Sequence, residues 1–133
     1  MPRISRSRVR ALRWTAVAVW AGVIFALSSV SGSDIRIGID VSAPAHFIEY
    51  AILGGLLVLA FDRSDRLLAA AAMASAYGVT DELHQLLVPG RMSDPADWAV
   101  DTAGALAGAA LAAWLLRRRA GQDSTRTRLA ARQ

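Results

Sequence analysis

Apolar residues in this 133-residue chain fall into four long blocks separated by short polar segments. The blocks lie at residues 14–30, 45–61, 67–88 and 98–116. A helix that crosses the hydrocarbon core of a bilayer needs about 20 mostly apolar residues, with a range of about 17–25. Each block has that length, so the pattern predicts four membrane-spanning helices rather than the periodic apolar positions of a soluble domain.

Helix-start and helix-stop signals lie at the edges of these blocks. The second block follows Ser42 and Pro44, a capping serine and an early proline. The third ends at the Pro89-Gly90 turn, and Asp94 with the proline after it precedes the fourth. The connections on either side of the third block are short, which favours antiparallel neighbours. We therefore expect an all-α membrane protein with four transmembrane helices in an up-down bundle.

The basic residues are distributed unevenly over this topology. All fifteen are Arg, and thirteen of them lie in the tail 1–13, the loop 62–66 and the tail 117–133, which share one side. Only Arg36 and Arg91 fall on the other side. Because cytoplasmic segments collect positive charge, we predict that both termini are cytoplasmic. The net charge of +4 then divides into +10 on the cytoplasmic side and −6 in the outer layer, which argues against nucleic-acid binding.

Composition and motifs exclude several kinds of chemistry. The sequence has no Cys, so disulfides, thiolate catalysis and Cys-based metal sites are ruled out. It has no Gly-rich phosphate loop, no Gly-x-Ser-x-Gly and no His-Glu-x-x-His, and its motifs identify no particular cofactor. The first block could also be a signal peptide cleaved near Ala26-Leu27-Ser28. We favour a membrane span, because cleavage would leave three further spans rather than a secreted domain.

Polar residues inside the predicted helices gather at the outer helix ends. They are His46, Glu49, Tyr50, Asp81, Glu82, His84, Gln85, Asp97 and Asp101. Residues three or four apart share a helix face, so these positions form stripes that we expect to line one outward-facing polar pocket. Gly104, Gly108 and Ala112 continue the stripe of the fourth helix with small residues, which let two membrane helices approach closely. That stripe should therefore face protein rather than lipid.

A carboxylate at mid-bilayer costs about 2.5–3.5 kcal/mol and less near the interface, so such residues are usually paired, face a cavity and are functional. One interpretation is acid–base chemistry, with His84 and Glu82 as proton carriers and Arg91 as a bidentate anchor for a phosphate or carboxylate. The structural alternative is that the carboxylates pair with one another and with Arg91 to hold the helices in register.

Two other kinds of site remain open at this point. His46-x-x-Glu49 and Asp81-x-x-His84 each place two metal ligands on one helix face, and two His with carboxylates suit zinc, iron or manganese. Such pairs are common by chance, and we do not predict a metal. A proton or ion path would also use intramembrane carboxylates. However, no ionisable residue is predicted in the inner half of any span, which argues against a complete channel.

The polar stripes carry a longer motif. The run Asp81-Glu82-Leu83-His84-Gln85, the turn Pro89-Gly90-Arg91, then Asp97, Asp101, Gly104 and Gly108, resembles the signature of the VanZ-like family. His46-Phe47-Ile48-Glu49-Tyr50 is similar to that family's second-helix motif, and Phe25 to Ser29 resembles the end of its first helix. The resemblance covers roughly residues 14–116.

The resemblance implies a small multi-pass protein of the bacterial inner membrane. The family is named for a member associated with resistance to teicoplanin, a glycopeptide that acts on cell-wall precursors, and the resemblance supplies no biochemical activity. Where many members have a Lys shortly before the histidine, this chain has Ala43. Arg36 or Arg91 would therefore have to hold an anionic group.

We thus expect the outer pocket to bind, or to bind and modify, the head group of an envelope lipid or lipid-linked precursor. The candidate catalytic residues are His84, Glu82 and Asp81, and the candidate binding residues are Arg91, Asp97, Asp101, His46, Glu49, Gln85 and Tyr50. The expected partners are membrane lipids and a lipid-linked cell-wall precursor or glycopeptide. The alternative is a non-catalytic protein whose polar cluster is structural and which binds a partner or the antibiotic.

Overall fold

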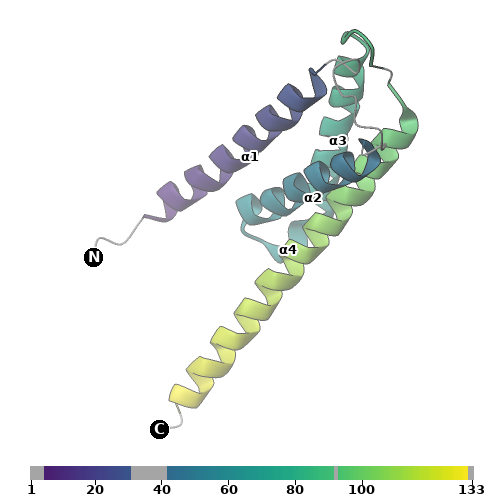
Figure 1. The fold of residues 1–133 in the computed structure, drawn as a ribbon. Coiled ribbons are helices and arrows are strands. Elements are labelled where there is room, and N and C mark those ends of the chain that lie inside the picture. The colour runs from purple at the N-terminus through teal and green to yellow at the C-terminus, as the bar shows by residue number, and fades with distance from the viewer. Residues whose placement is uncertain (1–4, 31–41, 92, 132–133) are drawn as a thin grey trace.

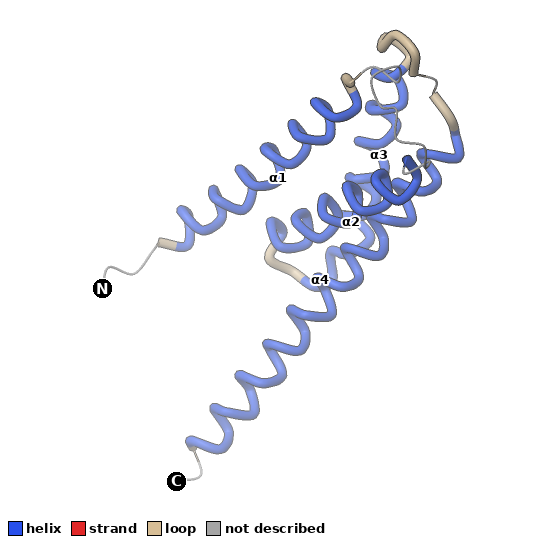
Figure 2. Tube along the Cα trace, viewed as in Figure 1, coloured by secondary structure: helices blue, strands red, loops and turns tan. Residues whose placement is uncertain are grey.

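The computed structural model describes residues 5–30, 42–91 and 93–131, and every regular element in these ranges is helical (Figures 1 and 2). The elements are α1 (Arg6–Ser28), α2 (Ser42–Phe61), the 3₁₀ turn η1 (Ser64–Arg66), α3 (Leu67–Gln85) and α4 (Pro95–Ala130). The long helices alternate in direction, which brings both termini to the same end of the molecule (Figure 1). The predicted all-helical class with four long helices is confirmed.

Three helices in the described ranges are long and apolar enough to cross a membrane. They are Arg6–Ser28, Ala43–Phe61 and Pro95–Ser124. Large apolar side chains also cover the outside of the molecule: Val19 is 61% exposed, Leu68 70% and Leu111 58%. A soluble protein rarely exposes so many large apolar side chains, whereas lipid-facing helices require them. The chain is therefore a multi-pass membrane protein.

The third predicted span, residues 67–88, is shorter and more polar than expected. The helix ends at Gln85, and the next residues form tight turns in which Leu87 N–H bonds to the carbonyl of His84 at 2.9 Å. Gly90 has a φ of 76°, the left-handed conformation that the predicted turn requires of a glycine. Polar residues occupy the last two turns, and α3 is not among the three helices that are long and apolar enough to span.

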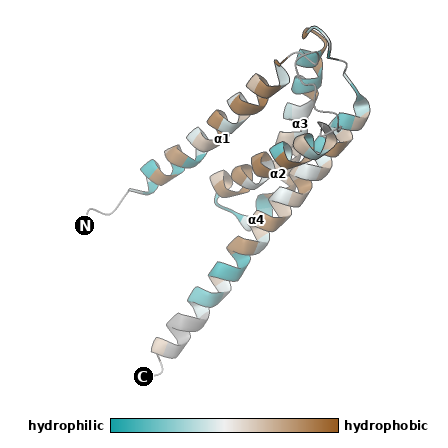
Figure 3. Ribbon diagram, viewed as in Figure 1, coloured by the Kyte–Doolittle hydropathy of each residue, from teal (hydrophilic) through white to brown (hydrophobic). Residues whose placement is uncertain are grey.

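The first and last helices extend beyond the predicted spans into the two Arg-rich tails. The first helix begins at Arg6 rather than at residue 14, and the Ser5 hydroxyl caps it by accepting a bond from the Arg8 N–H at 3.4 Å. The last helix continues past residue 116 to Ala130 without a break. Its 36 residues span about 54 Å, against about 30 Å for a hydrocarbon core. Its polar end therefore projects well beyond the other helices (Figures 1 and 3).

The closest helix pair is α2 with α4, and glycines form the crossing. A Cβ atom on Gly108 would collide with the backbone carbonyl of Ala51, and one on Gly104 with the carbonyl of Phe47. The predicted close approach through small residues is therefore confirmed. It turns the face of α4 that carries Asp101 toward α2, so the predicted stripe faces protein.

Small residues also build the core among α2, α3 and α4. The buried apolar residues of α3 and α4 are all alanines, and the larger side chains come from α2. They are Ala70, Ala71, Ala74, Ala105, Ala109, Ala112 and Ala113, with Tyr50, Leu53, Leu57 and Val58. Such a core permits short distances between helix axes, which suits association by close packing.

Side-chain bonds to backbone carbonyls attach α1 to the other helices. The Trp20 indole donates to the carbonyl of Glu49 at 2.9 Å, and the Tyr77 hydroxyl donates to the carbonyl of Ala21 at 2.7 Å. At the end near the termini, the rings of Trp14 and Phe61 meet edge to face at 5.6 Å. These contacts fix how α1 is rotated, which positions its last turn beside α3.

Candidate functional site

The predicted site residues come together at the end of the molecule opposite the two termini. The alternating helix directions place the start of α2, the end of α3 and the start of α4 at this end, where Figure 3 shows polar segments. We call this set the polar layer; it comprises His46, Glu49, Tyr50, Asp81, Glu82, His84, Gln85, Asp97 and Asp101. Asp81, Glu82, Gln85, His46 and Asp101 are all buried.

Asp101 and His46 form a buried pair between α4 and α2. The Asp101 Oδ1 lies 2.9 Å from His46 Nδ1, and the two side chains are 0% and 8% exposed. The other carboxylate oxygen lies beside Gly78, where a Cβ would be 3.3 Å from Asp101 Oδ2 and 3.4 Å from the Tyr50 ring. Gly78 therefore leaves space for the carboxylate and the phenol to approach each other.

Asp81 is held between α3 and α1. Its Oδ2 accepts a hydrogen bond from the Ser28 hydroxyl at 2.8 Å and another from Gln85 Nε2 at 3.1 Å. Ser28 is itself 4% exposed. The last turn of α1 therefore closes one side of the polar layer, which the sequence had assigned to the other three helices.

Glu82 faces the connection between α3 and α4. Its Oε2 accepts hydrogen bonds from the Ser93 hydroxyl and from the Asp94 backbone N–H, both at 2.8 Å. Asp94 in turn caps α4, because its Oδ1 accepts a bond from the Ala96 N–H at 2.8 Å. The predicted start of the fourth helix at Asp94 and Pro95 is confirmed, and Glu82 orders the segment that leads into it.

His84 lies on the opposite side of α3 from Glu82. Its Nε2 is 2.9 Å from the Ser29 hydroxyl, and its ring lies 4.2 Å from the Phe25 ring, centroid to centroid, with an angle of 30° between the planes. The imidazole is half-buried against α1. The two predicted proton carriers therefore share a helix but face different neighbours.

Arg91 contacts the end of α1 rather than a carboxylate. Its Nε donates to the carbonyl of Val30 at 3.2 Å, and its Nη2 donates to the carbonyl of Leu27 at 3.4 Å. A cation at a helix C-terminus is favourable, because the last carbonyls there have no partner within the helix. Its predicted role as an anion anchor would use its remaining N–H donors. Arg36, the other candidate for that role, lies outside the described residues.

Glu49 and Asp97 are half-buried at the edge of the layer. Glu49 interacts electrostatically with Asp81 and Asp101, and Asp97 with His46. Asp101 in turn interacts with Asp81. The buried His46 imidazole therefore lies among three acidic side chains, Asp101, Asp97 and Glu49.

Four buried polar side-chain atoms have no hydrogen-bond partner within the described part of the chain. They are Tyr50 OH, Asp81 Oδ1, Glu82 Oε1 and Asp101 Oδ2. An unsatisfied buried group costs about 1–3 kcal/mol, so native proteins hold few of them. All four belong to the polar layer, and three are carboxylate oxygens. The layer therefore contains more hydrogen-bond acceptors than its own donors satisfy.

The geometry supports neither the metal alternative nor the predicted outward-facing pocket. Across the described ranges, no three His, Asp or Glu side chains gather as ligands for a metal ion. Two hollows lined by described residues lie at the end near the termini, so they do not test the predicted outward-facing pocket. One of about 430 Å³ is bordered by Arg13, Trp14 and Phe61. The pocket stays a prediction.

Sequence reasoning missed the serines of the site. Ser28 and Ser29 were not among the candidate site residues, yet their hydroxyls form hydrogen bonds with Asp81 and His84. Their position in the sequence was a usable signal. The two hydroxyls lie at the outer end of the first span, at the same membrane depth as the polar residues of the other three spans. Ser93 carried no such signal, since its role depends on the path of the chain before α4.

The sequence profile of the VanZ/LLP1 family matches residues 13–117. The matched stretch contains every residue of the polar layer, and it ends where the Arg-rich end of α4 begins. Comparison with curated proteins and with solved structures found no match.

Proposed function

We propose that the polar layer of this chain, which belongs to the VanZ/LLP1 family, binds the head group of an envelope lipid or a lipid-linked precursor. Family membership alone specifies no ligand. The observation that carries the proposal is a group of four buried polar atoms in one layer among membrane helices, for which the described residues supply no hydrogen-bond partner. Atoms of this kind are expected where a ligand completes the hydrogen bonding.

The acceptor-rich character of the layer indicates the chemistry of the head group. Asp81, Glu82 and Asp101 each offer a free carboxylate oxygen, and Tyr50 offers a hydroxyl. A complementary head group brings N–H or O–H donors, as a primary ammonium or the hydroxyl and amide groups of a sugar do. His46 orients Asp101 through the bond between Nδ1 and Oδ1 and is a positioning residue.

The same proposal includes a version in which the head group is also modified. Proton transfer then falls to His84 and Glu82, with Asp81 beside them, because these residue types carry protons in general acid–base catalysis. Since His84 faces α1 and Glu82 faces the segment before α4, α3 lies between them, and a head group would have to extend over the end of α3 to reach both. Arg91 would bind an anionic part of the ligand through its free N–H donors.

A second function is favoured by the hydrogen bonds that join helices across the layer. Ser28 bonds to Asp81 between α1 and α3, and His46 bonds to Asp101 between α2 and α4. In this alternative the hydrogen bonds of the layer stabilise the packing of the helices, and the protein acts by binding a partner or a glycopeptide. A role in glycopeptide resistance is compatible with either function.

Lipid-dependent thermal stability of the full-length protein in neutral detergent distinguishes the two functions. We expect phosphatidylethanolamine, or a polyprenyl-linked amino sugar, to stabilise the protein, because either brings N–H donors. Phosphatidylcholine with the same acyl chains should stabilise it less, since its ammonium has no N–H. A ligand at a hundred times its Kd stabilises by about 2.7 kcal/mol, a measurable shift in Tm.

Asp101→Asn is the test variant, and Asp123→Asn, farther along the same helix, is the charge-matched control. The proposal expects Asp101→Asn to reduce the lipid-dependent shift and the control to keep it. Equal shifts with both lipids, unchanged in Asp101→Asn, would refute head-group binding. Loss of stability in Asp101→Asn with no preference between the lipids would support the structural alternative.

A further inference from the structure

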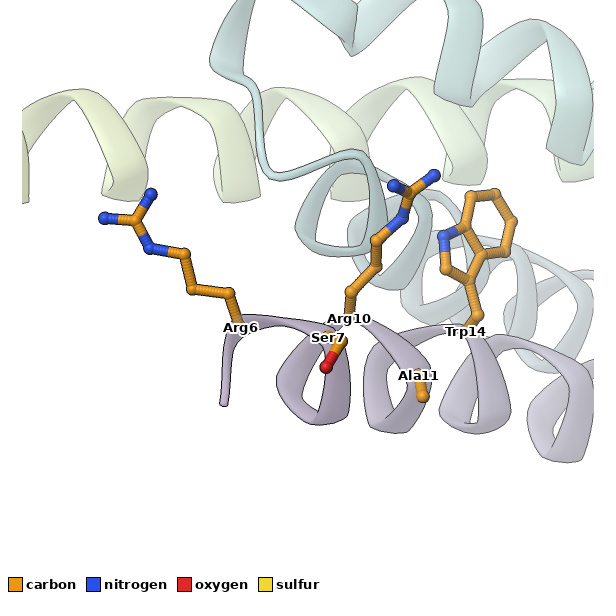
Figure 4. Close-up of a pocket in the computed structure, with 5 residues that line it drawn as sticks. All are labelled: Arg6, Ser7, Arg10, Ala11 and Trp14. Carbon is orange, nitrogen blue, oxygen red and sulfur yellow. The ribbon is translucent and has the colours of Figure 1, made fainter. Parts of the chain in front are cut away.

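A surface hollow of about 450 Å³ lies along the first turns of α1, at the end of the molecule opposite the polar layer. It is lined by Arg6, Ser7, Arg10, Ala11 and Trp14 (Figure 4). Arg6, Arg10 and Trp14 project from one side of the helix, as their spacing of four residues requires (Figure 4). Two guanidinium groups and an indole therefore share one surface.

The charges of this surface are only partly compensated within the protein. Arg13 forms an ion pair with Asp62, at the end of α2. Asp62 adopts a φ of 56°, and the turn it makes places its carboxylate beside α1. Neither Arg6 nor Arg10 has a carboxylate partner among the described residues. Like charges four residues apart destabilise a helix, so an external anion between these two side chains would be favourable.

The position of the hollow indicates which anion reaches it. The long apolar stretch of α1 begins at Trp14, and tryptophan is typical of the boundary between lipid tails and head groups. At 1.5 Å per residue, Arg10 lies about 6 Å and Arg6 about 12 Å beyond that residue along the helix. The head-group region extends about 5–7 Å beyond the hydrocarbon core, so Arg10 lies at the depth of the phosphate groups and the long side chain of Arg6 reaches back toward it. Leu12, on the same turns, is 64% exposed and suits contact with lipid.

We propose that this hollow is a binding site for the phosphate of an anionic phospholipid. Arg6 and Arg10 would bind the phosphate oxygens, because guanidinium groups match phosphate in geometry and charge. The Trp14 indole would lie against the glycerol and upper acyl region. Arg13 is excluded from this role by its pairing with Asp62. The site is separate from the polar layer and does not depend on the function proposed for it.

Native mass spectrometry of the full-length protein, released from detergent after addition of one lipid, tests this site. The probes are phosphatidylglycerol and phosphatidylcholine with identical acyl chains. An arginine near an anionic surface contributes about fivefold to binding, so Arg10→Gln should retain about fivefold less phosphatidylglycerol. The double variant Arg6→Gln with Arg10→Gln should retain about 25-fold less. Both side chains are on the surface, so the fold should be preserved.

Arg119→Gln is the matched control, because it removes the same charge from an exposed position at the same end of the molecule. We expect it to bind phosphatidylglycerol within about twofold of the wild type. A loss as large as that of Arg10→Gln would show a diffuse charge effect and overturn the site. Equal retention of the two lipids would overturn it as well. Displacement of the lipid by millimolar inorganic phosphate would identify a free anion as the ligand and refute the lipid assignment.

Discussion

Gly108→Ala is expected to destabilise the protein, although alanine is normally the better helix former. Gly108 lies where α4 crosses α2, and a Cβ there would collide with the backbone carbonyl of Ala51. A carbonyl oxygen of a neighbouring helix cannot rotate away as a flexible side chain could. The helices must therefore separate, which loosens the pair that positions Asp101 against His46.

The size of the effect follows from two opposing contributions. Replacing glycine by alanine within a helix gains about 1 kcal/mol through helix propensity. Overpacking a tight contact costs about 1–3 kcal/mol, and a collision with backbone belongs in the upper part of that range. We expect a net destabilisation of about 1–2 kcal/mol for Gly108→Ala.

Gly22 and Gly55 provide matched controls within the same protein. A Cβ on Gly22 would meet no atom within 4 Å, so Gly22→Ala should be neutral or stabilising by up to about 1 kcal/mol. A Cβ on Gly55 would lie 3.4 Å from the carbonyl oxygen of Gly108, which is close to ordinary contact, so Gly55→Ala should be intermediate. The expected order of stability is Gly22→Ala, then Gly55→Ala, then Gly108→Ala.

The assay is unfolding in mixed micelles of a mild detergent and dodecyl sulfate, followed by circular dichroism. The midpoint of each variant gives its difference in unfolding free energy. Equal midpoints for Gly108→Ala and Gly22→Ala would refute the reasoning, because the two variants share the propensity gain and differ only in the contact between helices.

Three further predictions concern other contacts. Ser28→Ala removes the hydroxyl that bonds to Asp81 at 2.8 Å, and it should destabilise the protein by about 0.6–1.7 kcal/mol in the same unfolding assay, with Thr15→Ala on the same helix as the control. Trp20→Phe keeps an aromatic ring but loses the bond to the carbonyl of Glu49, so a loss of about 0.5–1.5 kcal/mol is expected, and no loss would show that this bond does not hold α1 in place. A reporter that is active only outside the cytoplasm, fused after Gln133, should stay inactive if the predicted orientation holds, and activity would reverse it.

The polar layer could be predicted from the sequence, because the position of a residue along an apolar block gives its depth in the membrane. The position of Asp81, Glu82 and His84 near the end of one apolar block, and of Asp101 near the start of the next, placed them at the same level. The hydrogen-bond partners of these side chains could not be predicted from the sequence. The structural alternative drawn from the sequence paired the carboxylates with Arg91, whereas this guanidinium donates to the carbonyls of Leu27 and Val30 at the end of α1.

The sequence by itself determined the helical class, the number of long helices and the depth of their polar residues. A continuous apolar segment in a membrane must satisfy its backbone internally, so its length and hydropathy suffice to predict a helix. Only the tertiary structure decided how each helix is rotated and which neighbour it meets. The bonds of Ser28 to Asp81 and of His46 to Asp101 join residues 53 and 55 positions apart. Such pairs depend on the distances between helix axes. For His46 and Asp101 that distance is set at the crossing of α2 and α4, where glycines let two backbones touch.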